Sequence, residues 1–454
     1  MIELKREIYQ ELLKWKQEDS RKVLEIEGAR QVGKTYILNK FAKENYSQFI
    51  YVNMLQTSGR ELLQCFAKAT EWEPGQPRPK NPLHDAFVLF EPDFQDTKET
   101  VVVIDEIQES AEVYSKIRQF ARDFSCHFIV TGSYLGKTLD KEYFLPAGDM
   151  DVLIMETLSY EEFLDSVGKR GVYETVSLYG DSAHSDYEEL KEYYRIYTEI
   201  GGYPAVVKKY LETKDVGKCR EVLRNIIRIF IDESERYFNN VIEIQLFDQI
   251  FSAIAQSMIK EKKGSGDLVS ELSSILFKEE SNRLTKTSIN QAIAWLYRSH
   301  IVGYCNRVNE CNMMDVSYNT RFYFRDVGLA RYFLKMTGAD PGTVQGIVSK
   351  NFVYLYLERQ IRQSLIAGNA PAFGTYKGGE IDFYVRSLDS YKDYAIEVKA
   401  GNNQGKTARQ ILLDKKVERV YYLKGDTYGG LHEGAATVPI YLTGRIAFKK
   451  IMSK

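Results

Sequence analysis

Residues 28–35, Gly-Ala-Arg-Gln-Val-Gly-Lys-Thr, fit the pattern GxxxxGK[ST] of loops that bind phosphate groups. Apolar residues with strand character precede the loop at 23–26, and residues 37–41 follow it with helical spacing. The pattern needs these flanks, because a strand aims the loop and a helix N-terminus turns free N–H groups and its positive dipole end toward the phosphates. An ordinary glycine-containing turn is the alternative, and both flanks disfavour it. The sequence therefore predicts a nucleotide-binding loop.

The loop suggests roles for individual side chains. Lys34 is expected to reach the β and γ phosphates of the nucleotide, and the Thr35 hydroxyl to ligate Mg²⁺. The residues expected to line the nucleotide are Gly28, Ala29, Arg30, Gln31, Val32, Gly33, Lys34, Thr35 and Tyr36.

A second pattern, at residues 101–106, supplies acidic groups. Four consecutive β-branched residues, Val101 to Ile104, are typical of a strand buried on both faces of a parallel sheet. Asp105 and Glu106 follow, at the strand end where open α/β sheets bind ligands. Asp105 is expected to hold Mg²⁺, directly or through water, and Glu106 to accept the proton of an attacking water. A solvated Asp-Glu pair that opens a loop is the alternative for the two residues alone.

Further strands are predicted at 49–52, 128–133 and 152–155. The strand at 49–52 lies in sequence between the phosphate-loop strand and the acidic strand, which suits the class of ATPases that have an additional strand between those two. At the end of the strand from 128, Ser133 or Thr131 would sense the γ-phosphate or the lytic water. Capping of the strand end is an equally good interpretation of Ser133.

Composition sets outer limits. A chain of 454 residues has room for about three domains. No apolar run approaches the length of a membrane span, so no membrane partner is expected. The five cysteines are scattered without CxxC spacing, which favours free thiols in a reducing cytoplasm over structural zinc. The net charge of −2 gives no general indication of a nucleic-acid partner.

Residues 166–260 have a helical pattern, which predicts a lid beside the nucleotide. Residues 261–335 suggest a winged helix, with a helix at 284–297 and wing strands at 302–308 and 316–324. Between residues 261 and 300, six basic residues face five acidic ones, whereas a surface that neutralises several phosphates shows a clear excess. DNA binding and packing between domains both remain open for this segment.

The last hundred residues hold a second candidate site. Asp382 is followed by Glu397 and Lys399 with fourteen residues between Asp382 and Glu397, which matches the metal-dependent nuclease pattern PD-(D/E)xK. Strand periodicity places Glu397 and Lys399 on one face. The two acids would bind Mg²⁺ and the lysine would orient or activate a water. A solvated hairpin that pairs Glu with Lys is the alternative.

Taken together, the motifs resemble a prokaryotic family of AAA-type P-loop ATPases with a C-terminal domain of unknown function and restriction-endonuclease-like fold. The resemblance is carried by GARQVGKT at 28–35, IDEIQ at 104–108, TGS at 131–133, LSYEEFL at 158–164, GGYP at 201–204, FRDVGLARYFL at 324–334, NFVYLYL at 351–357, GEIDF at 379–383 and IEVKAG at 396–401. It implies an α/β fold with ATP and Mg²⁺ as ligands. The implied division is an ATPase domain at 1–165, a helical lid at 166–260, a winged helix at 261–335 and the endonuclease-like domain at 336–454.

The chain departs from that family at two positions. Similar proteins often have an acid immediately before NFV, where this chain has Lys350. Glu358 lies eight helical residues further on, about 800° around the axis and so roughly 80° off that face. A cation in place of a metal ligand predicts a degenerate, vestigial nuclease site. Many relatives also have Arg or Lys where this chain has Asp149, so a trans-acting finger in an oligomer is in doubt.

Three hypotheses of function follow. The first is a Mg²⁺-dependent ATP hydrolase that acts as a molecular switch or motor, in which hydrolysis moves the helical and winged-helix parts relative to the P-loop domain. An oligomer and a protein partner both stay open. The second is an ATP-regulated nuclease that uses Asp382, Glu397 and Lys399. The third is a nucleic-acid-binding or scaffold protein in which ATP is structural. We favour the first, because its residues are complete, whereas the nuclease site lacks an acid and the winged helix lacks a basic surface.

Overall fold

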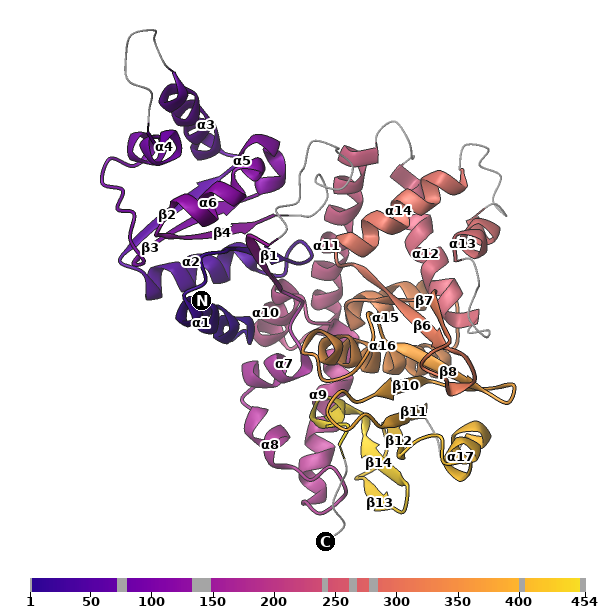
Figure 1. Cartoon of the computed structure of the whole chain (residues 1–454). Coiled ribbons are helices and arrows are strands. Elements are labelled where there is room, and N and C mark those ends of the chain that lie inside the picture. Colours follow the sequence, from indigo (N-terminus) through magenta and orange to yellow (C-terminus); the bar gives the residue numbers. More distant parts are fainter. Residues whose placement is uncertain are drawn as a thin grey trace. The chain divides into compact units, whose positions relative to one another are not determined.

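The computed structural model describes residues 2–71, 80–132, 148–238, 244–260, 268–276, 285–399 and 405–449 (Figure 1). The chain divides into two compact units. One comprises residues 6–156, and the other residues 1–5 together with 157–454. Within the described ranges, no helix combines the length and the apolar character that crossing a membrane requires.

A five-stranded parallel sheet forms the centre of the 6–156 unit. Its strands are β1 (Val23–Glu27), β2 (Gln48–Asn53), β3 (Thr100–Asp105), β4 (His127–Thr131) and β5 (Met150–Ile154). The order is β2-β3-β4-β1-β5, and every neighbouring pair is parallel. All five predicted strands form, and β4 separates the phosphate-loop strand β1 from the acidic strand β3. The predicted P-loop sheet of the additional-strand class is confirmed, but the additional strand is β4 and not the segment 49–52, which forms the edge strand β2 beside β3.

Helices cover this sheet, and aromatic side chains fill the space beneath them. The helices are α1 (Ile8–Glu18), α2 (Lys34–Asn45), α3 (Thr57–Thr70), α4 (Pro82–Phe90), α5 (Ala111–Ser115) and α6 (Ile117–Asp123), with a 3-10 turn at Ile107–Glu109. Helix α2 packs on β2 and β3, and α6 on β1 and β5. Every residue of β3 and β4 is buried, as the β-branched run predicts. Phe120 of α6 stacks on Phe128 of β4 with ring centroids 4.5 Å apart.

Among the described residues, the larger unit contains eight α-helices before its first strand and two more, α15 and α16, after β7. They are α7 (Tyr160–Ser166), α8 (Arg170–Thr175), α9 (His184–Ile200), α10 (Pro204–Thr213), α11 (Val216–Phe238), α12 (Ile244–Lys260), α13 (Leu268–Leu276), α14 (Lys286–Arg298), α15 (Val327–Met336) and α16 (Pro341–Arg362). Ser159 and Glu162 form the capping box expected of their spacing at the start of α7. The predicted helix at 284–297 corresponds to α14.

Two sheets complete this unit. The four-stranded sheet has the order β7-β6-β8-β9, and the five-stranded sheet the order β10-β11-β12-β14-β13. Their strands are β6 (Val302–Val308), β7 (Val316–Phe324), β8 (Ala372–Tyr376), β9 (Gly379–Ile381), β10 (Phe383–Arg386), β11 (Asp393–Lys399), β12 (Arg419–Lys424), β13 (Gly430–His432) and β14 (Ala435–Pro439), with α17 (Lys406–Leu413) packed on β9, β11 and β12.

The four-stranded sheet bears on the predicted domain limits. The expected wing strands form β6 and β7, and β6 then pairs in parallel with β8. The predicted domain boundary between residues 335 and 336 therefore separates β6 and β7 from β8, although the three strands belong to one sheet. The separation of residues 166–454 into lid, winged helix and endonuclease-like domain stays a prediction.

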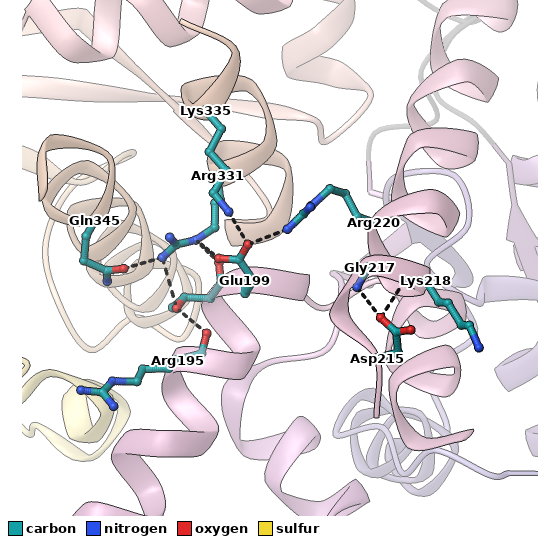
Figure 2. A network of polar contacts seen from close by, with 10 residues as sticks. Arg195, Glu199, Asp215, Gly217, Lys218, Arg220, Arg331, Lys335 and Gln345 are labelled. Atoms are coloured by element: carbon teal, nitrogen blue, oxygen red, sulfur yellow. Dashed lines mark hydrogen bonds and ion pairs between the residues drawn. The ribbon is translucent and has the colours of Figure 1, made fainter. Parts of the chain in front are cut away.

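An ionic network joins four helices of this unit (Figure 2). Glu199 at the end of α9 accepts contacts from Arg220 of α11 at 3.2 Å and Arg331 of α15 at 3.3 Å, and it also pairs with Lys335. Arg331 in turn donates to the Thr198 carbonyl and to Gln345 of α16. Burial raises the pKa of Glu199, but the three cations outweigh it and hold the pKa below its usual value. The charged carboxylate thus ties α9, α11, α15 and α16 together.

Candidate functional site

The phosphate-binding loop leaves β1 and ends at the first turn of α2. Gly28 has φ 146°, and a Cβ there would lie 2.1 Å from the Met155 carbonyl oxygen. Only glycine therefore lets the loop begin this close to the end of β5. Gly33 precedes α2 with φ 97°, and no side chain caps the helix at that position. The first backbone N–H groups of α2 consequently face the loop, in the orientation that suits a phosphate.

Two basic side chains hold the loop. Lys34 Nζ donates to the carbonyl oxygens of Gly28, at 2.8 Å, and Ala29, at 2.9 Å, so the ammonium lies across the loop. Arg6 Nη1 donates to the Val32 carbonyl at 2.8 Å, and its other terminal nitrogen to the Glu156 carbonyl. Arg6 is a residue that the spacing of the loop motif does not reveal. It connects the loop to the chain segment that follows β5.

The predicted metal ligands meet at the end of β3. Thr35 Oγ1 donates to Asp105 Oδ2 at 2.8 Å, and Tyr51 of β2 donates to the same oxygen at 2.7 Å. Burial raises the pKa of Tyr51 to about 12, so its hydroxyl stays a neutral donor at neutral pH. A hydroxyl and a carboxylate are hard oxygen donors of the kind that Mg²⁺ prefers. This pair fits the metal ion that the fold implies.

Glu106, the expected base, lies beside this pair in a left-handed backbone conformation with φ 54°. Its Oε2 accepts a hydrogen bond from Gln108 Nε2 at 2.5 Å, and its Oε1 lies 3.8 Å from Arg30 Nη1 of the loop. A Cβ on Gly132 would lie 2.0 Å from Gln108 Oε1, so the glycine after β4 makes room for this amide. Glu106 is thus positioned by the loop, by the turn after β3 and indirectly by the end of β4.

The sequence also drew attention to Ser133, Thr131 and Asp149 around the nucleotide site. Ser133 lies outside the described residues. Thr131, the alternative sensor, is fully buried and donates its hydroxyl to the Ile26 carbonyl, which joins β4 to β1. Asp149, where relatives have a basic residue, pairs with Arg118 at 3.0 Å and Arg122 at 3.2 Å.

The second predicted site also comes together. Lys399 Nζ lies 2.7 Å from Glu397 Oε2, which agrees with the expected shared face of β11. Asp382 lies next to them, and Lys350 of α16 pairs with it at 3.0 Å. Glu358 instead accepts from Arg325 at 2.5 Å, so it does not take the place of the missing acid.

The acids of this second site do not form a metal centre. No group of three or more His, Cys, Asp or Glu side chains that could hold a metal ion occurs in the described part of the chain. Asp382 and Glu397 are instead each paired with a lysine ammonium, so this donor set does not fit the divalent cation that the nuclease pattern implies.

The sheet order, the loop and the acidic strand end define a P-loop ATPase domain of AAA type. Residues 20–164 match the sequence model of an AAA domain. Residues 191–340 match a domain of unknown function. No curated protein sequence matches the chain.

The chain is similar to several solved structures. A Walker-type ATPase of Pyrococcus abyssi has 15% identity over 73% of this chain and 96% of its own, with a TM-score of 0.47. The ORC2 protein of Aeropyrum pernix has 14% identity over 77% and 95%, with a TM-score of 0.37. The RuvB Holliday junction branch migration motor of Thermotoga maritima has 14% identity over 66% and 90%, with a TM-score of 0.30. At these identities and TM-scores the similarities say nothing about activity.

Proposed function

We propose that this protein hydrolyses ATP to ADP and phosphate in a Mg²⁺-dependent reaction, and that it uses the hydrolysis as a molecular switch or motor. The observation that carries the proposal is the convergence of Thr35, Asp105 and Glu106 at the mouth of the loop that Lys34 spans. A phosphate-binding cation, two candidate metal ligands and a candidate base, which are groups that phosphoryl transfer to water uses, thus belong to one unit.

In this mechanism the chain's own groups orient the reactants. The loop N–H groups and the Lys34 ammonium bind the β and γ phosphates, and Thr35 with Asp105 would hold the metal ion. Mg²⁺, when bound, neutralises charge on the phosphate oxygens. Glu106 accepts a proton from water as the water oxygen bonds to the γ-phosphorus. The bond between that phosphorus and the β–γ bridging oxygen breaks, and ADP leaves with the electron pair.

Two variants of the full chain test the proposal by single-turnover hydrolysis of ATP. Lys34→Ala is expected to lose nucleotide binding together with hydrolysis. Glu106→Gln is expected to keep ATP bound but to hydrolyse it about 100-fold to 1,000-fold more slowly, since a positioned base contributes about that much.

Glu112→Gln is the matched control, because Glu112 is exposed in the first turn of α5. This substitution is expected to leave turnover unchanged. Normal hydrolysis in either site variant would refute the mechanism.

The other two hypotheses have less support. The acids of the nuclease pattern are paired with lysines, which weighs against a metal-dependent cut. The near-balanced charge of residues 261–300 does not favour a nucleic-acid partner. We therefore propose ATP as the ligand of this protein.

A further inference from the structure

Four charged side chains of the larger unit gather around the point where the chain passes from one sheet to the other. Asp382 is the single residue between β9, in the four-stranded sheet, and β10, in the five-stranded sheet. Phe383 pairs with Ile396 across β10 and β11, so the register brings Asp382 opposite Glu397. The backbone N–H of Val398 donates to Asp382 Oδ2 at 2.7 Å, which fixes the carboxylate against β11.

Without a neighbouring cation, two buried carboxylates in this arrangement would lower the stability of the fold. Asp382 is 9% exposed and Glu397 is 2% exposed, so neither is screened by much water. Like charges directly opposite each other on antiparallel strands destabilise a sheet, and burial of an unpaired charge adds to the cost. Burial and the neighbouring Asp382 both raise the pKa of Glu397. The pair requires a cation.

The chain supplies that cation from α16. Lys350 Nζ lies 3.0 Å from Asp382 Oδ1, and Lys399 Nζ lies 2.7 Å from Glu397 Oε2. The two acids and two ammonium groups sum to zero charge. Glu397 Oε1 is buried and has no hydrogen-bond partner among the residues that the structure describes, so one carboxylate oxygen of the cluster still has capacity for a ligand.

We propose that the Lys350 ammonium occupies the position of a divalent cation between Asp382 and Glu397, and so excludes Mg²⁺ and Mn²⁺ from this cluster. The cluster then serves as an internal, metal-free joint between the two sheets and α16. Removal of the ammonium leaves two buried acids, one with an unused oxygen, and opens a divalent-cation site. This inference does not depend on ATP hydrolysis.

The test measures Mn²⁺ binding to the nucleotide-free full chain by electron paramagnetic resonance. Every chain also has Asp105→Asn, which removes the predicted metal ligand of the ATP site. In this background we expect no saturable Mn²⁺ binding with a dissociation constant below about 1 mM. Two acids that lysines neutralise are poorer metal ligands than those of weak natural sites. The chain with Lys350→Glu is expected to bind one Mn²⁺ at least about tenfold more tightly than the background chain. Addition of Asp382→Asn to this variant is expected to abolish that binding.

Lys350→Met separates loss of the ammonium from gain of an acid, and it too is expected to bind Mn²⁺ more tightly than the background. Its matched control is Lys377→Met, which breaks a lysine pair of similar length, to Asp414 at 2.7 Å, without touching the cluster. Circular dichroism establishes that each variant is folded. If Lys350→Glu does not fold, Lys350→Met decides the matter.

Two results would overturn the proposal. One is a background chain that already binds Mn²⁺ as tightly as the Lys350 variants and loses it with Asp382→Asn. The other is a folded Lys350 variant with no gain in Mn²⁺ affinity over Lys377→Met.

Discussion

Tyr51, on the edge strand of the ATPase sheet, contacts a predicted metal ligand. It lies on β2, opposite Val103 of β3, and its hydroxyl donates to Oδ2 of Asp105, the last residue of β3. The same oxygen accepts from Thr35. One carboxylate oxygen thus receives two hydroxyl donors, and these donors set the direction in which the carboxylate can bind a metal ion. Partners of this kind often matter nearly as much as the ligands themselves.

Tyr51→Phe removes only the hydroxyl and keeps the ring in place. We expect it to raise the Mg²⁺ concentration for half-maximal ATP hydrolysis about tenfold, because a lost partner of a metal ligand typically weakens metal affinity by about that factor. A titration of Mg²⁺ at saturating ATP measures the shift. Tyr9→Phe is the control, since the Tyr9 hydroxyl donates to Glu44 rather than to the site. An unchanged Mg²⁺ requirement in Tyr51→Phe would contradict this role.

At the residue scale the sequence predicted the groups that a local motif contains. Lys34, Thr35, Asp105 and Glu106 all lie where the spacing and the strand pattern indicate. Tyr51, Gln108 and Arg6 were not assigned roles, because their contacts depend on which strands become neighbours and how the turn after β3 folds. No spacing rule encodes such contacts. Lys350 was recognised as a departure, but its contact with Asp382 depends on how α16 packs on β11.

At the scale of elements, two glycine-containing motifs meet. Gly202 of GGYP lies against Leu158, whose N–H donates to the Gly202 carbonyl at 2.7 Å. Asp326 of the FRDVGLARYFL motif caps α15 and also accepts from the Gly202 N–H at 2.8 Å. These motifs of the resemblance therefore have a packing role at the junction of α9, α10 and α15.

Gly202→Ala is expected to lower the free energy of unfolding by about 2–3 kcal/mol, in the range of overpacked sites. A Cβ at Gly202 would lie 2.1 Å from the Leu158 carbonyl oxygen, so the backbone would have to shift. Urea denaturation of the full chain measures the change. Gly346→Ala in α16 is the control, because its Cβ would meet nothing within 4 Å and alanine favours a helix interior. Equal stability of the two variants would argue against the close contact.

Element positions were predicted more reliably than their partners. The strands at 302–308 and 316–324 form, yet β6 also pairs with β8, more than sixty residues along the chain. The motif GEIDF spans β9 and the start of β10, and these two strands belong to different sheets, with Asp382 between them. Alternation of apolar residues predicts extended backbone, but it does not show where a chain leaves one sheet for another.

At the scale of the whole molecule, each of the two units contains a cluster of buried hydrophobic residues. One cluster of buried residues, from Val23 to Val130, belongs to the 6–156 unit, and another, from Val308 to Tyr422, belongs to the larger unit. The proposed ATP site uses residues of the 6–156 unit alone, whereas the Lys350 cluster belongs to the other. Because each unit has its own sheets and its own cluster of buried residues, we expect calorimetry to resolve two thermal transitions.

ATP with Mg²⁺ should then move only one of these transitions. A ligand at a hundred times its dissociation constant stabilises the unit that binds it by about 2.7 kcal/mol. For a unit of this size, this corresponds to a rise of roughly 5–10 °C in the midpoint of its transition. Lys34→Ala should abolish the shift and leave both transitions of the ligand-free protein in place. If ATP raised both midpoints equally in the wild-type chain, the two units would unfold together. That result would contradict the expectation of two independent thermal transitions.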